Sequence, residues 1–285
     1  MKARAFSYRR VTTVEEAFEA FAACGDDALF IAGGQSLVPA MALRMHGPRL
    51  LIDIAHIAAL RGIVLQDGWL RIGALTRHCE MLSDPLIAQH APLLRAAAHH
   101  VAHPAIRNRG TIGGSIALAD PAAEFPAMML ALGAELEIVG PDGSRRVAAD
   151  DYFIELFQTA LEPGELLVAA HIPLPDLRHC WAFDELARRR GDFAMVGCGI
   201  DGVVDDGRIE RIRIAFFAVG NTPVRVRHAE AALIGAAFAP ATIAAAQAAL
   251  ATDLTPPEDE QVPAAMRLHL ARVLLGRLLG RLGAQ

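Results

Sequence analysis

The sequence predicts an α+β fold in two domains. Its 285 residues exceed the ~150 that one domain commonly needs. Its first part mixes helical periods with short apolar runs and hairpins that turn at Asp-Gly pairs, and its last part is Ala- and Leu-rich helix. Two prolines in Ile172-Pro-Leu-Pro-Asp176 indicate a boundary between the two domains. We therefore expect a first domain at 1–176, with subdomains at about 1–57 and 58–176, and a second, small α+β domain with a short antiparallel sheet at 177–285.

The N-terminal stretch predicts a small β-α-β unit. Residues 12–24 have apolar side chains at a helical period, opened by the capping candidates Thr12 or Thr13. A short apolar run at 28–32 predicts a strand, which a glycine turn joins to a helix at 36–43. The run at 50–54 predicts a second buried strand, which favours parallel pairing.

Hairpins dominate the middle of the chain. Strands at 62–66 and 69–72 flank Asp67-Gly68, and strands at 135–139 and 145–147 flank Asp142-Gly143. Between the hairpins, a helical pattern runs from 85 to 101. The segment 103–115 is too polar and glycine-rich for a core element, and we expect it to be a functional loop.

The last stretch predicts one hairpin and two helices. The hairpin pairs 194–204 with 208–219, and the helices cover about 229–251 and 264–282. The final helix combines a leucine stripe with four arginines. We expect these arginines to form a solvated face, with a docking face for a partner as the alternative. They are Arg267, Arg272, Arg277 and Arg281.

Composition excludes several classes of protein. The net charge of -5 lacks the footprint of a nucleic-acid binder. We expect no transmembrane segment, because no apolar run reaches the ~18 residues a membrane helix needs, and no secretory signal is visible, so a cytoplasmic location is expected. The cysteines are too far apart for a zinc or iron–sulfur site, which places any cluster on another chain. They are Cys24, Cys79, Cys180 and Cys198.

Two loops share a design that suits phosphates. Ala32-Gly-Gly-Gln-Ser36 follows a predicted strand, and Thr111-Ile-Gly-Gly-Ser115 follows the polar segment. Glycine pairs let backbone N–H groups face an anion, and a helix start behind the first loop adds a favourable dipole. Singly, each loop is more simply a turn. As a pair, they predict a site for the two phosphates of a dinucleotide.

Two carboxylates follow the second loop. Asp120 and Glu124 precede a predicted helix. Because carboxylates repel phosphates, we expect them to face ribose or ribityl hydroxyls. Capping of the helix is the alternative for Asp120.

Other chemistries are less well supported. The G-x-G-x-x-G pattern at 197–202 is followed by a hairpin rather than a helix, so it does not predict a Rossmann site. His99, His100 and His103 lack a carboxylate or cysteine at ligand spacing, so no metal is expected. No G-x-S-x-G elbow supports a serine hydrolase. The cationic turn 188–193 is a solvated charge run or stabilises an anionic reduced cofactor.

With these residues in view, the chain resembles the FAD-binding medium subunit of molybdenum hydroxylases, the group that includes carbon monoxide dehydrogenase and bacterial xanthine dehydrogenase. The likeness rests on A-G-G-Q-S at 32–36, R-N-R-G-T-I-G-G-S at 107–115, A-D-P-A-A-E at 119–124 and R-G-D-F-A at 190–194. It implies an FAD-binding fold of the vanillyl-alcohol oxidase and p-cresol methylhydroxylase type, followed by a small α+β domain. The sequence departs from common family residues at Gln35, Ser115, Phe193 and the basic residues of the turn.

The resemblance implies that the two loops hold the FAD pyrophosphate, that the carboxylates lie near the ribityl and adenosine hydroxyls, and that Phe193 and an arginine of the turn lie near the isoalloxazine. No protein residue is expected to be catalytic, since the flavin carries the chemistry. The candidate FAD contacts are Ala32, Gly33, Gly34, Gln35, Ser36, Leu37, Arg107, Asn108, Thr111, Ile112, Gly113, Gly114, Ser115, Asp120, Glu124, Leu161, Arg188, Arg189, Arg190, Asp192 and Phe193.

Three functions remain open at this point. The resemblance implies an electron-transfer flavoprotein, which takes electrons from a small iron–sulfur subunit and passes them to NAD, a quinone or oxygen, beside a large molybdenum-cofactor subunit in a dimer of heterotrimers. The alternatives are a stand-alone FAD oxidoreductase of the same fold and a non-catalytic assembly module. A neighbouring subunit with iron–sulfur cysteines favours the first, and retained FAD excludes the last.

Overall fold

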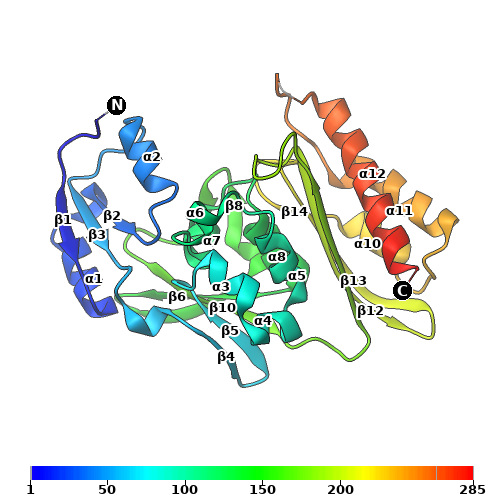
Figure 1. The fold of residues 1–285 in the computed structure, drawn as a ribbon, viewed down its shortest axis with the longest axis horizontal. Helices are drawn as coiled ribbons and strands as arrows, with labels where there is room; N and C mark the ends of the chain where they lie inside the picture. The colour runs from blue at the N-terminus through cyan, green and yellow to red at the C-terminus, as the bar shows by residue number, and fades with distance from the viewer. Residues whose placement is uncertain (1, 261, 285) are drawn as a thin grey trace.

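The computed structural model describes residues 2–260 and 262–284, and it arranges them as three units in a row (Figure 1). A three-stranded sheet forms the N-terminal unit, a five-stranded sheet with helices forms the middle unit, and a four-stranded sheet with helices forms the C-terminal unit. The predicted α+β class is confirmed. In the part of the chain described, no helix is long and apolar enough to span a bilayer.

The N-terminal unit is the predicted β-α-β unit with one extra strand. All its strand pairs are parallel, in the order β1-β3-β2. Strand β1 was not predicted, because its four residues are all exposed and show no alternation of apolar and polar side chains. The elements are β1 (Ser7–Arg10), α1 (Val14–Ala22), η1 (Gly25–Asp27), β2 (Ala28–Ile31), α2 (Leu37–Ala42), β3 (Leu50–Asp53) and η2 (Ala58–Leu60).

Helix α1 begins where its capping residues predict. The hydroxyl of Thr13 accepts the N–H of Glu16 at 3.2 Å, and the carboxylate of Glu16 accepts the N–H of Thr12 at 2.7 Å. These two bonds satisfy N–H groups at the start of the helix that have no partner within it. The helix then buries Ala17 and Ala20 against the sheet.

The middle unit is an antiparallel sheet covered by short helices. Both predicted hairpins are present, in the strand order β4-β5-β10-β6-β7. Asp67 and Gly68 both have positive φ, as a two-residue hairpin turn requires. The strands are β4 (Ile63–Gln66), β5 (Trp69–Gly73), β6 (Glu135–Gly140), β7 (Gly143–Ala148), β8 (Phe153–Glu155), β9 (Gln158–Thr159) and β10 (Leu166–Pro173).

The helices of the middle unit differ from the prediction in two places. The expected helix 85–101 is two helices, because Pro92 has no N–H to continue the first one and instead begins the second. The expected loop 103–115 contains α6 and the start of α7, so that part of the prediction was wrong. The helices are α3 (His78–Ser83), α4 (Pro85–His90), α5 (Pro92–Ala98), α6 (Pro104–Arg107), α7 (Ile112–Leu118), α8 (Glu124–Leu132) and α9 (Ala149–Tyr152).

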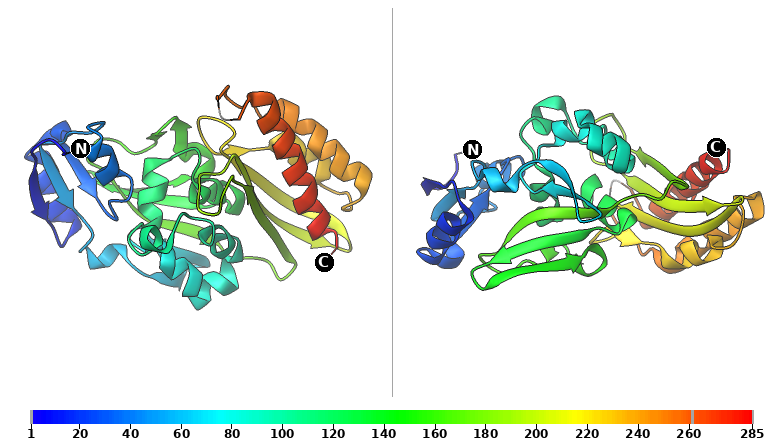
Figure 2. Two further views of the ribbon diagram at one scale, coloured as in Figure 1. Left: turned by 45° about the horizontal axis from the view of Figure 1, so that its top comes forward. Right: turned by 90° about the horizontal axis from the view of Figure 1, so that it is seen from below.

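The C-terminal unit packs a sheet between two layers of helices (Figure 2). Helices α10 and α12 contact one face of the sheet, and α5 and α8 of the middle unit contact the other. Phe216 accordingly lies in the C-terminal core and its neighbour Phe217 in the core of the middle unit. The elements are β11 (His179–Leu186), β12 (Val196–Asp205), β13 (Arg208–Phe217), β14 (Val224–Arg225), α10 (Arg227–Leu233), α11 (Pro240–Asp253) and α12 (Ala264–Leu282).

Three sequence predictions for this unit have clear outcomes. The hairpin and the last helix are confirmed. The helix expected at 229–251 is broken, because Gly235 at φ +79° pairs by its backbone with the start of β13. The arginines of α12 are not one solvated face, because Arg267 is only 7% exposed. Its Nη1 donates to the carbonyls of Met195 and Ala218, and its Nη2 lies 3.0 Å from a carboxylate oxygen of Asp259.

The G-x-G-x-x-G glycines lie in strand β12, as the sequence analysis expected for a hairpin. A Cβ at Gly197 would lie 1.9 Å from the ring of Phe217, and one at Gly199 would lie 2.4 Å from Met128 Cε. These glycines therefore allow the ring of Phe217 from β13 and the side chain of Met128 from α8 to lie close to the strand, and they form no nucleotide loop.

Candidate functional site

The two glycine loops predicted from the sequence lie against each other. A Cβ at Gly33 would lie 2.2 Å from the carbonyl oxygen of Arg109 and 2.9 Å from the Cα of Gly110. Only glycine allows backbones to approach this closely. The contact joins the N-terminal unit to the middle unit, and a cleft lies on either side of it.

The first loop carries N–H groups that have no protein partner. Gly34, at φ +72°, turns the chain between β2 and α2. The backbone N–H groups of Gly34, Gln35 and Ser36 donate to no acceptor within residues 2–260 and 262–284, whereas Val38 N–H closes onto the carbonyl of Gly34. The side chain of Gln35 stiffens the loop, because its Nε2 donates to the Gly33 carbonyl at 3.0 Å. Consecutive unpaired N–H groups form a concave site for an anion.

The second loop differs from the sequence expectation. Its N–H groups are used within the protein: Ile112 donates to Thr76 O, Gly113 to Ala74 O and Ser115 to Thr111 O, at 2.8 to 3.1 Å. Gly114 donates to the hydroxyl of Thr111, which caps α7. The expectation that both loops offer free N–H groups was therefore wrong.

Gly113 has a packing role instead. A Cβ at this position would lie 2.4 Å from the Cβ of Ala74 and 2.7 Å from its carbonyl oxygen. The start of α7 consequently rests on the end of strand β5. Gly114 is exposed and Ser115 is half-buried, so these two residues present the loop to a ligand.

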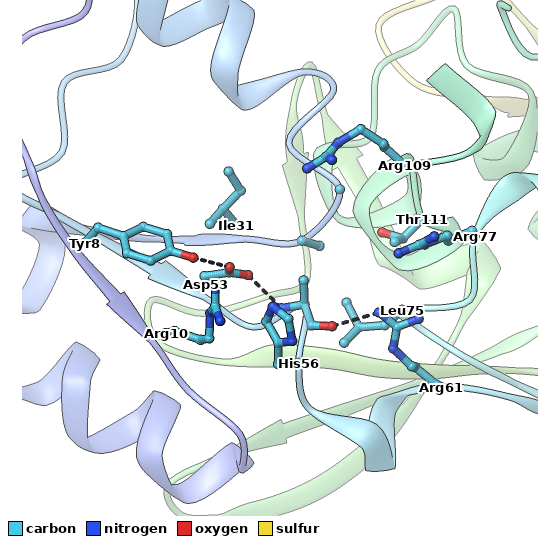
Figure 3. Close-up of a pocket in the computed structure, with 13 residues that line it drawn as sticks. Tyr8, Arg10, Ile31, Asp53, His56, Arg61, Leu75, Arg77, Arg109 and Thr111 are labelled. Atoms are coloured by element: carbon cyan, nitrogen blue, oxygen red, sulfur yellow. Dashed lines mark hydrogen bonds between the residues drawn. The ribbon is translucent and has the colours of Figure 1, made fainter. Parts of the chain in front are cut away.

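Two cavities flank the Gly33–Arg109 contact. The smaller, about 280 Å³, lies beside the first loop. Its lining residues are Ile31, Gly33, Gly34, Gln35, Val38, Pro39 and Arg109. The larger, about 460 Å³, lies where the parallel strands end and faces the middle unit (Figure 3). Gly34 and Gln35, whose N–H groups are unpaired, line the smaller cavity together with Arg109, which suits the cavity to a phosphate.

The predicted carboxylates occupy different environments. Asp120 Oδ1 accepts the N–H of Ala122 at 2.9 Å, but the N-cap of α8 is Ala123, so the helix-capping alternative for Asp120 was wrong. Glu124 is the first residue of α8, and burial raises its pKa to about 8, with a further contribution from the carboxylate of Glu185. A carboxyl group with this pKa is mostly protonated at pH 7 and can donate a hydrogen bond to a hydroxyl or a ring.

Glu124 lies at the seam between the middle and C-terminal units. Glu185 comes from strand β11, and its Oε1 lies 3.2 Å from His100 Nδ1. This hydrogen bond raises the pKa of His100. The seam thus combines carboxyl groups of both units with one imidazole.

The cationic turn also lies at this seam. The arginines of the turn are exposed, and Phe193 is 73% exposed. A Cβ at Gly191, whose φ is +87°, would lie 2.7 Å from His103 Cε1. The turn between β11 and β12 therefore lies on the segment just before α6.

The remaining candidates have more ordinary surroundings. The side chain of Arg107 bonds to the backbone just before it, because its Nη1 donates to the carbonyls of Val101 and Ala102 at 2.8 and 2.9 Å. Asn108 is exposed, and Leu161 is half-buried against the core of the middle unit. The described residues contain no cluster of His, Cys, Asp and Glu that would hold a metal ion.

Sequence reasoning missed one buried residue beside the second loop. The ring nitrogens of His78 are buried without a hydrogen-bond partner, and a Cβ on Gly110 would lie 3.1 Å from this ring. Burial lowers the pKa of His78 to about 4, so the ring is neutral at pH 7. Nothing in the sequence distinguishes this histidine from the other ten.

Comparison with known proteins gives matches along the chain. Residues 4–175 match the family described as "FAD binding domain in molybdopterin dehydrogenase", and residues 181–282 match "CO dehydrogenase flavoprotein C-terminal domain". The chain is 39% identical over 282 residues to the 6-hydroxypseudooxynicotine dehydrogenase complex subunit alpha of Paenarthrobacter nicotinovorans, covering 99% of this chain and 95% of that one. It is 35% identical over 280 residues to the carbon monoxide dehydrogenase medium chain of Afipia carboxidovorans, covering 98% and 97%.

Solved structures are similar over the same length. A chain of the carbon monoxide dehydrogenase from Hydrogenophaga pseudoflava superposes with a TM-score of 0.97 at 38% identity, covering 100% of this chain and 99% of that one. A chain of quinoline 2-oxidoreductase from Pseudomonas putida 86 superposes with a TM-score of 0.94 at 38% identity, with the same coverage.

Proposed function

We propose, from the premise that this chain belongs to the family of FAD-binding medium subunits of molybdenum hydroxylases, that it relays electrons from an iron–sulfur subunit to an external acceptor. Its cofactor is FAD, and it is a subunit of an oxidoreductase. The observation that carries the proposal is the first glycine loop, whose residues Gly34 and Gln35 have unpaired N–H groups and line a cavity together with Arg109.

The residues present fit FAD at its diphosphate. In our proposal, the N–H groups of Gly34 to Ser36 bind the diphosphate, since they are the backbone donors that no protein acceptor uses. Arg109 adds a positive charge from the other side. Gly33 lines the same cavity, and Ala32 and Leu37 flank the loop in the chain. From the second loop, Gly114 and Ser115 reach the ligand, while Thr111, Ile112 and Gly113 fix its position through their hydrogen bonds.

The other end of the cofactor belongs, in this proposal, at the seam with the C-terminal unit. Phe193 is the exposed aromatic side chain there and would cover one face of the ring. The protonated carboxyl of Glu124 would donate to a ribityl or ring oxygen, and Asp120 would accept from a hydroxyl. The cationic residues Arg188, Arg189 and Arg190, with Asp192, would set the charge near the ring, and Leu161 would line it.

FAD accepts electrons singly or in pairs, which suits a relay between one-electron iron–sulfur clusters and a two-electron acceptor. The chain's own contribution is to hold the cofactor, to exclude water from its ring and to tune its charge. Substrate oxidation would take place at molybdenum on a large subunit, with clusters on a small subunit, in a dimer of heterotrimers. NAD, a quinone and oxygen are the candidate acceptors.

The visible absorption spectrum of the purified protein, followed by acid precipitation and identification of the released nucleotide, tests the proposal. Released FAD is the expected result. Co-purification of a chain with iron–sulfur cysteines would support the relay. A protein that releases no nucleotide, and that takes up no FAD alone or with its partner chains, would rule the proposal out.

A further inference from the structure

The seam between the middle and C-terminal units brings three titratable side chains together, at the ring end of the proposed FAD site. Glu124 begins α8, His100 follows α5, and Glu185 belongs to β11. Helix α5 contacts both α8 and β11, and Figure 1 shows α5 and α8 side by side. The three side chains therefore come from separate elements that pack against one another.

Glu185 is held against His100 and is shielded from solvent. Its Oε1 lies 3.2 Å from His100 Nδ1, and its side chain is only 6% exposed. The imidazole also meets the ring of Phe183 edge to face, with 5.1 Å between the ring centroids. Residues two apart on a strand point to the same face, so Phe183 and Glu185 both face the middle unit. A carboxylate buried this far is costly unless a cation lies beside it, and His100 is that cation when it is protonated.

Glu185 and His100 act on Glu124 in opposite directions. The carboxylate of Glu185 repels a negative charge on Glu124, whereas a protonated His100 attracts it. Burial and Glu185 raise the pKa of Glu124 to about 8, and the hydrogen bond to Glu185 raises the pKa of His100 above 6.5. Because the groups interact, a change in the charge of one moves the proton occupancy of the others.

Other charged groups around Glu124 are weaker or lie elsewhere along α8. Asp120, in the loop before α8, adds a smaller repulsion than Glu185. His78 of α3 meets the ring of Phe125, but its imidazole is neutral at pH 7 because burial lowers its pKa to about 4. Arg213 of β13 donates to the carbonyl of Leu130, toward the other end of the helix. The cations of β13 and β14 are paired there with carboxylates: Arg213 and Arg225, with Asp150 and Glu230.

The groups around His100 leave Glu185 as its main partner. Asp184, the neighbour of Glu185 on β11, pairs with Arg281 at 2.6 Å. His99 is neutral at pH 7, because burial and the charge of Arg95 lower its pKa. The arginines at 188–190 follow Glu185 in the chain but are exposed, so solvent screens their charge.

We propose that Glu185 and His100 are positioning residues that set the proton occupancy of Glu124 from opposite sides, and that they thereby make the reduction potential of the bound FAD depend on pH. Glu185 favours the protonated carboxyl, and His100 favours the carboxylate. Electrons added to the ring increase its negative charge, so a carboxylate beside the ring lowers the potential and a neutral carboxyl does not. The inference rests on the proposed function, which places Glu124 beside the ribityl chain and the ring.

An infrared pH titration of the FAD-free chain tests the cluster itself. The signal is the carbonyl band of protonated carboxyl groups, and the part that Glu124→Gln removes belongs to Glu124. Its midpoint should move down by about one pH unit in Glu185→Gln, which removes an anion, and up in His100→Gln, which removes a cation. Both new amides can keep a hydrogen bond across the 3.2 Å contact, so neither variant leaves a buried group without a partner.

Spectroelectrochemical titration of the FAD-loaded protein, with whatever partner chains co-purify, tests the link to the cofactor. The wild-type potential should show an additional fall around pH 8 that Glu124→Gln lacks. This fall should move to lower pH in Glu185→Gln and to higher pH in His100→Gln. The matched controls are Glu15→Gln and His269→Gln, at exposed positions of α1 and α12, and they should leave both titrations unchanged.

Three results would overturn the inference: a Glu124 band that moves in neither variant, a band that moves in the same direction in both, or a FAD potential whose pH dependence does not follow the band. The second result would mean that the substitutions only loosen the seam. Failure of the proposed function is distinguishable, because it shows as absent flavin absorbance. That outcome removes the link to the potential, while the infrared result on the cluster stands.

Discussion

Replacing one hydroxyl of the first loop with a carboxylate tests whether the N–H groups of this loop bind the FAD diphosphate. Ser36 is exposed, its hydroxyl makes no capping hydrogen bond, and it occupies the N-cap of α2. Ser36→Asp therefore places a carboxylate beside the proposed phosphate position without removing a contact. Aspartate is as good an N-cap as serine, and a negative charge favours a helix start, so the FAD-free protein should unfold at the same temperature as wild type.

The repulsion can be estimated from Coulomb's law. For a carboxylate about 5 Å from one phosphate charge, the energy is roughly 1 to 3 kcal/mol for effective dielectric constants of about 80 to 20. The dissociation constant of FAD should accordingly rise roughly 5- to 150-fold. Ser36→Asn is the matched control, because it has the same shape and capping ability without the charge.

Fluorescence titration of the FAD-free chain, or of the complex after flavin removal, measures this difference. High salt should narrow the gap between the two variants, since it screens the charge. Equal FAD affinity of the Asp and Asn variants at low salt would place the diphosphate elsewhere and refute the reasoning from the unpaired N–H groups.

Three further predictions concern stability. Gly113→Ala should destabilise the FAD-free protein by about 1 to 3 kcal/mol in chemical unfolding, because the new methyl group overlaps Ala74, whereas Gly280→Ala in open space on α12 should be neutral or stabilising. Arg267→Ala should cost about 3 kcal/mol by taking the guanidinium donor from two carbonyls and the cation from Asp259, whereas exposed Arg277→Ala should change the unfolding temperature little. The folded state raises the pKa of Glu124 from 4.5 to about 8, so the stability that its protonated carboxyl contributes is present below pH 4.5 and is lost as the pH rises to 8. Glu124→Gln should therefore reduce the fall of the unfolding temperature between pH 4.5 and pH 8. An unchanged fall would contradict the raised pKa.

The elements that the sequence predicted well are those specified by neighbouring residues. A two-residue hairpin turn needs positive φ angles at both residues, which an Asp-Gly pair tolerates. Both residues have positive φ in the Asp67-Gly68 and Asp206-Gly207 turns. Helix α12 matches its predicted bounds because its leucine stripe extends over its whole length. Strand β1 was missed because its place at the edge of the sheet comes from pairing with β3, to which its own exposed residues give no clue.

The candidate site was predicted in part, for a similar reason. The glycine pairs predicted both loops, and the two loops lie against each other in the structure. What the sequence could not tell was the role of each glycine, because that depends on distant partners: Gly33 lies against Arg109, and Gly113 lies against Ala74. The same holds for Arg267, whose periodicity indicated a surface position but whose guanidinium donates to the carbonyls of Met195 and Ala218.

These distant contacts also explain why the site needs little rearrangement to receive a ligand. Gly33 fixes the N-terminal unit against the middle unit, and Asp150 of α9 fixes the C-terminal unit by binding Arg213, Arg225 and Arg227 at 2.6, 3.4 and 2.9 Å. The first loop is thus held at its seam before FAD arrives, and little binding energy is lost in ordering it. It follows that a substitution at Asp150, which lies in none of the cavities described, would loosen the seam at Glu124 and Phe193 and weaken FAD binding by misplacing the two walls, without removing any contact to the cofactor.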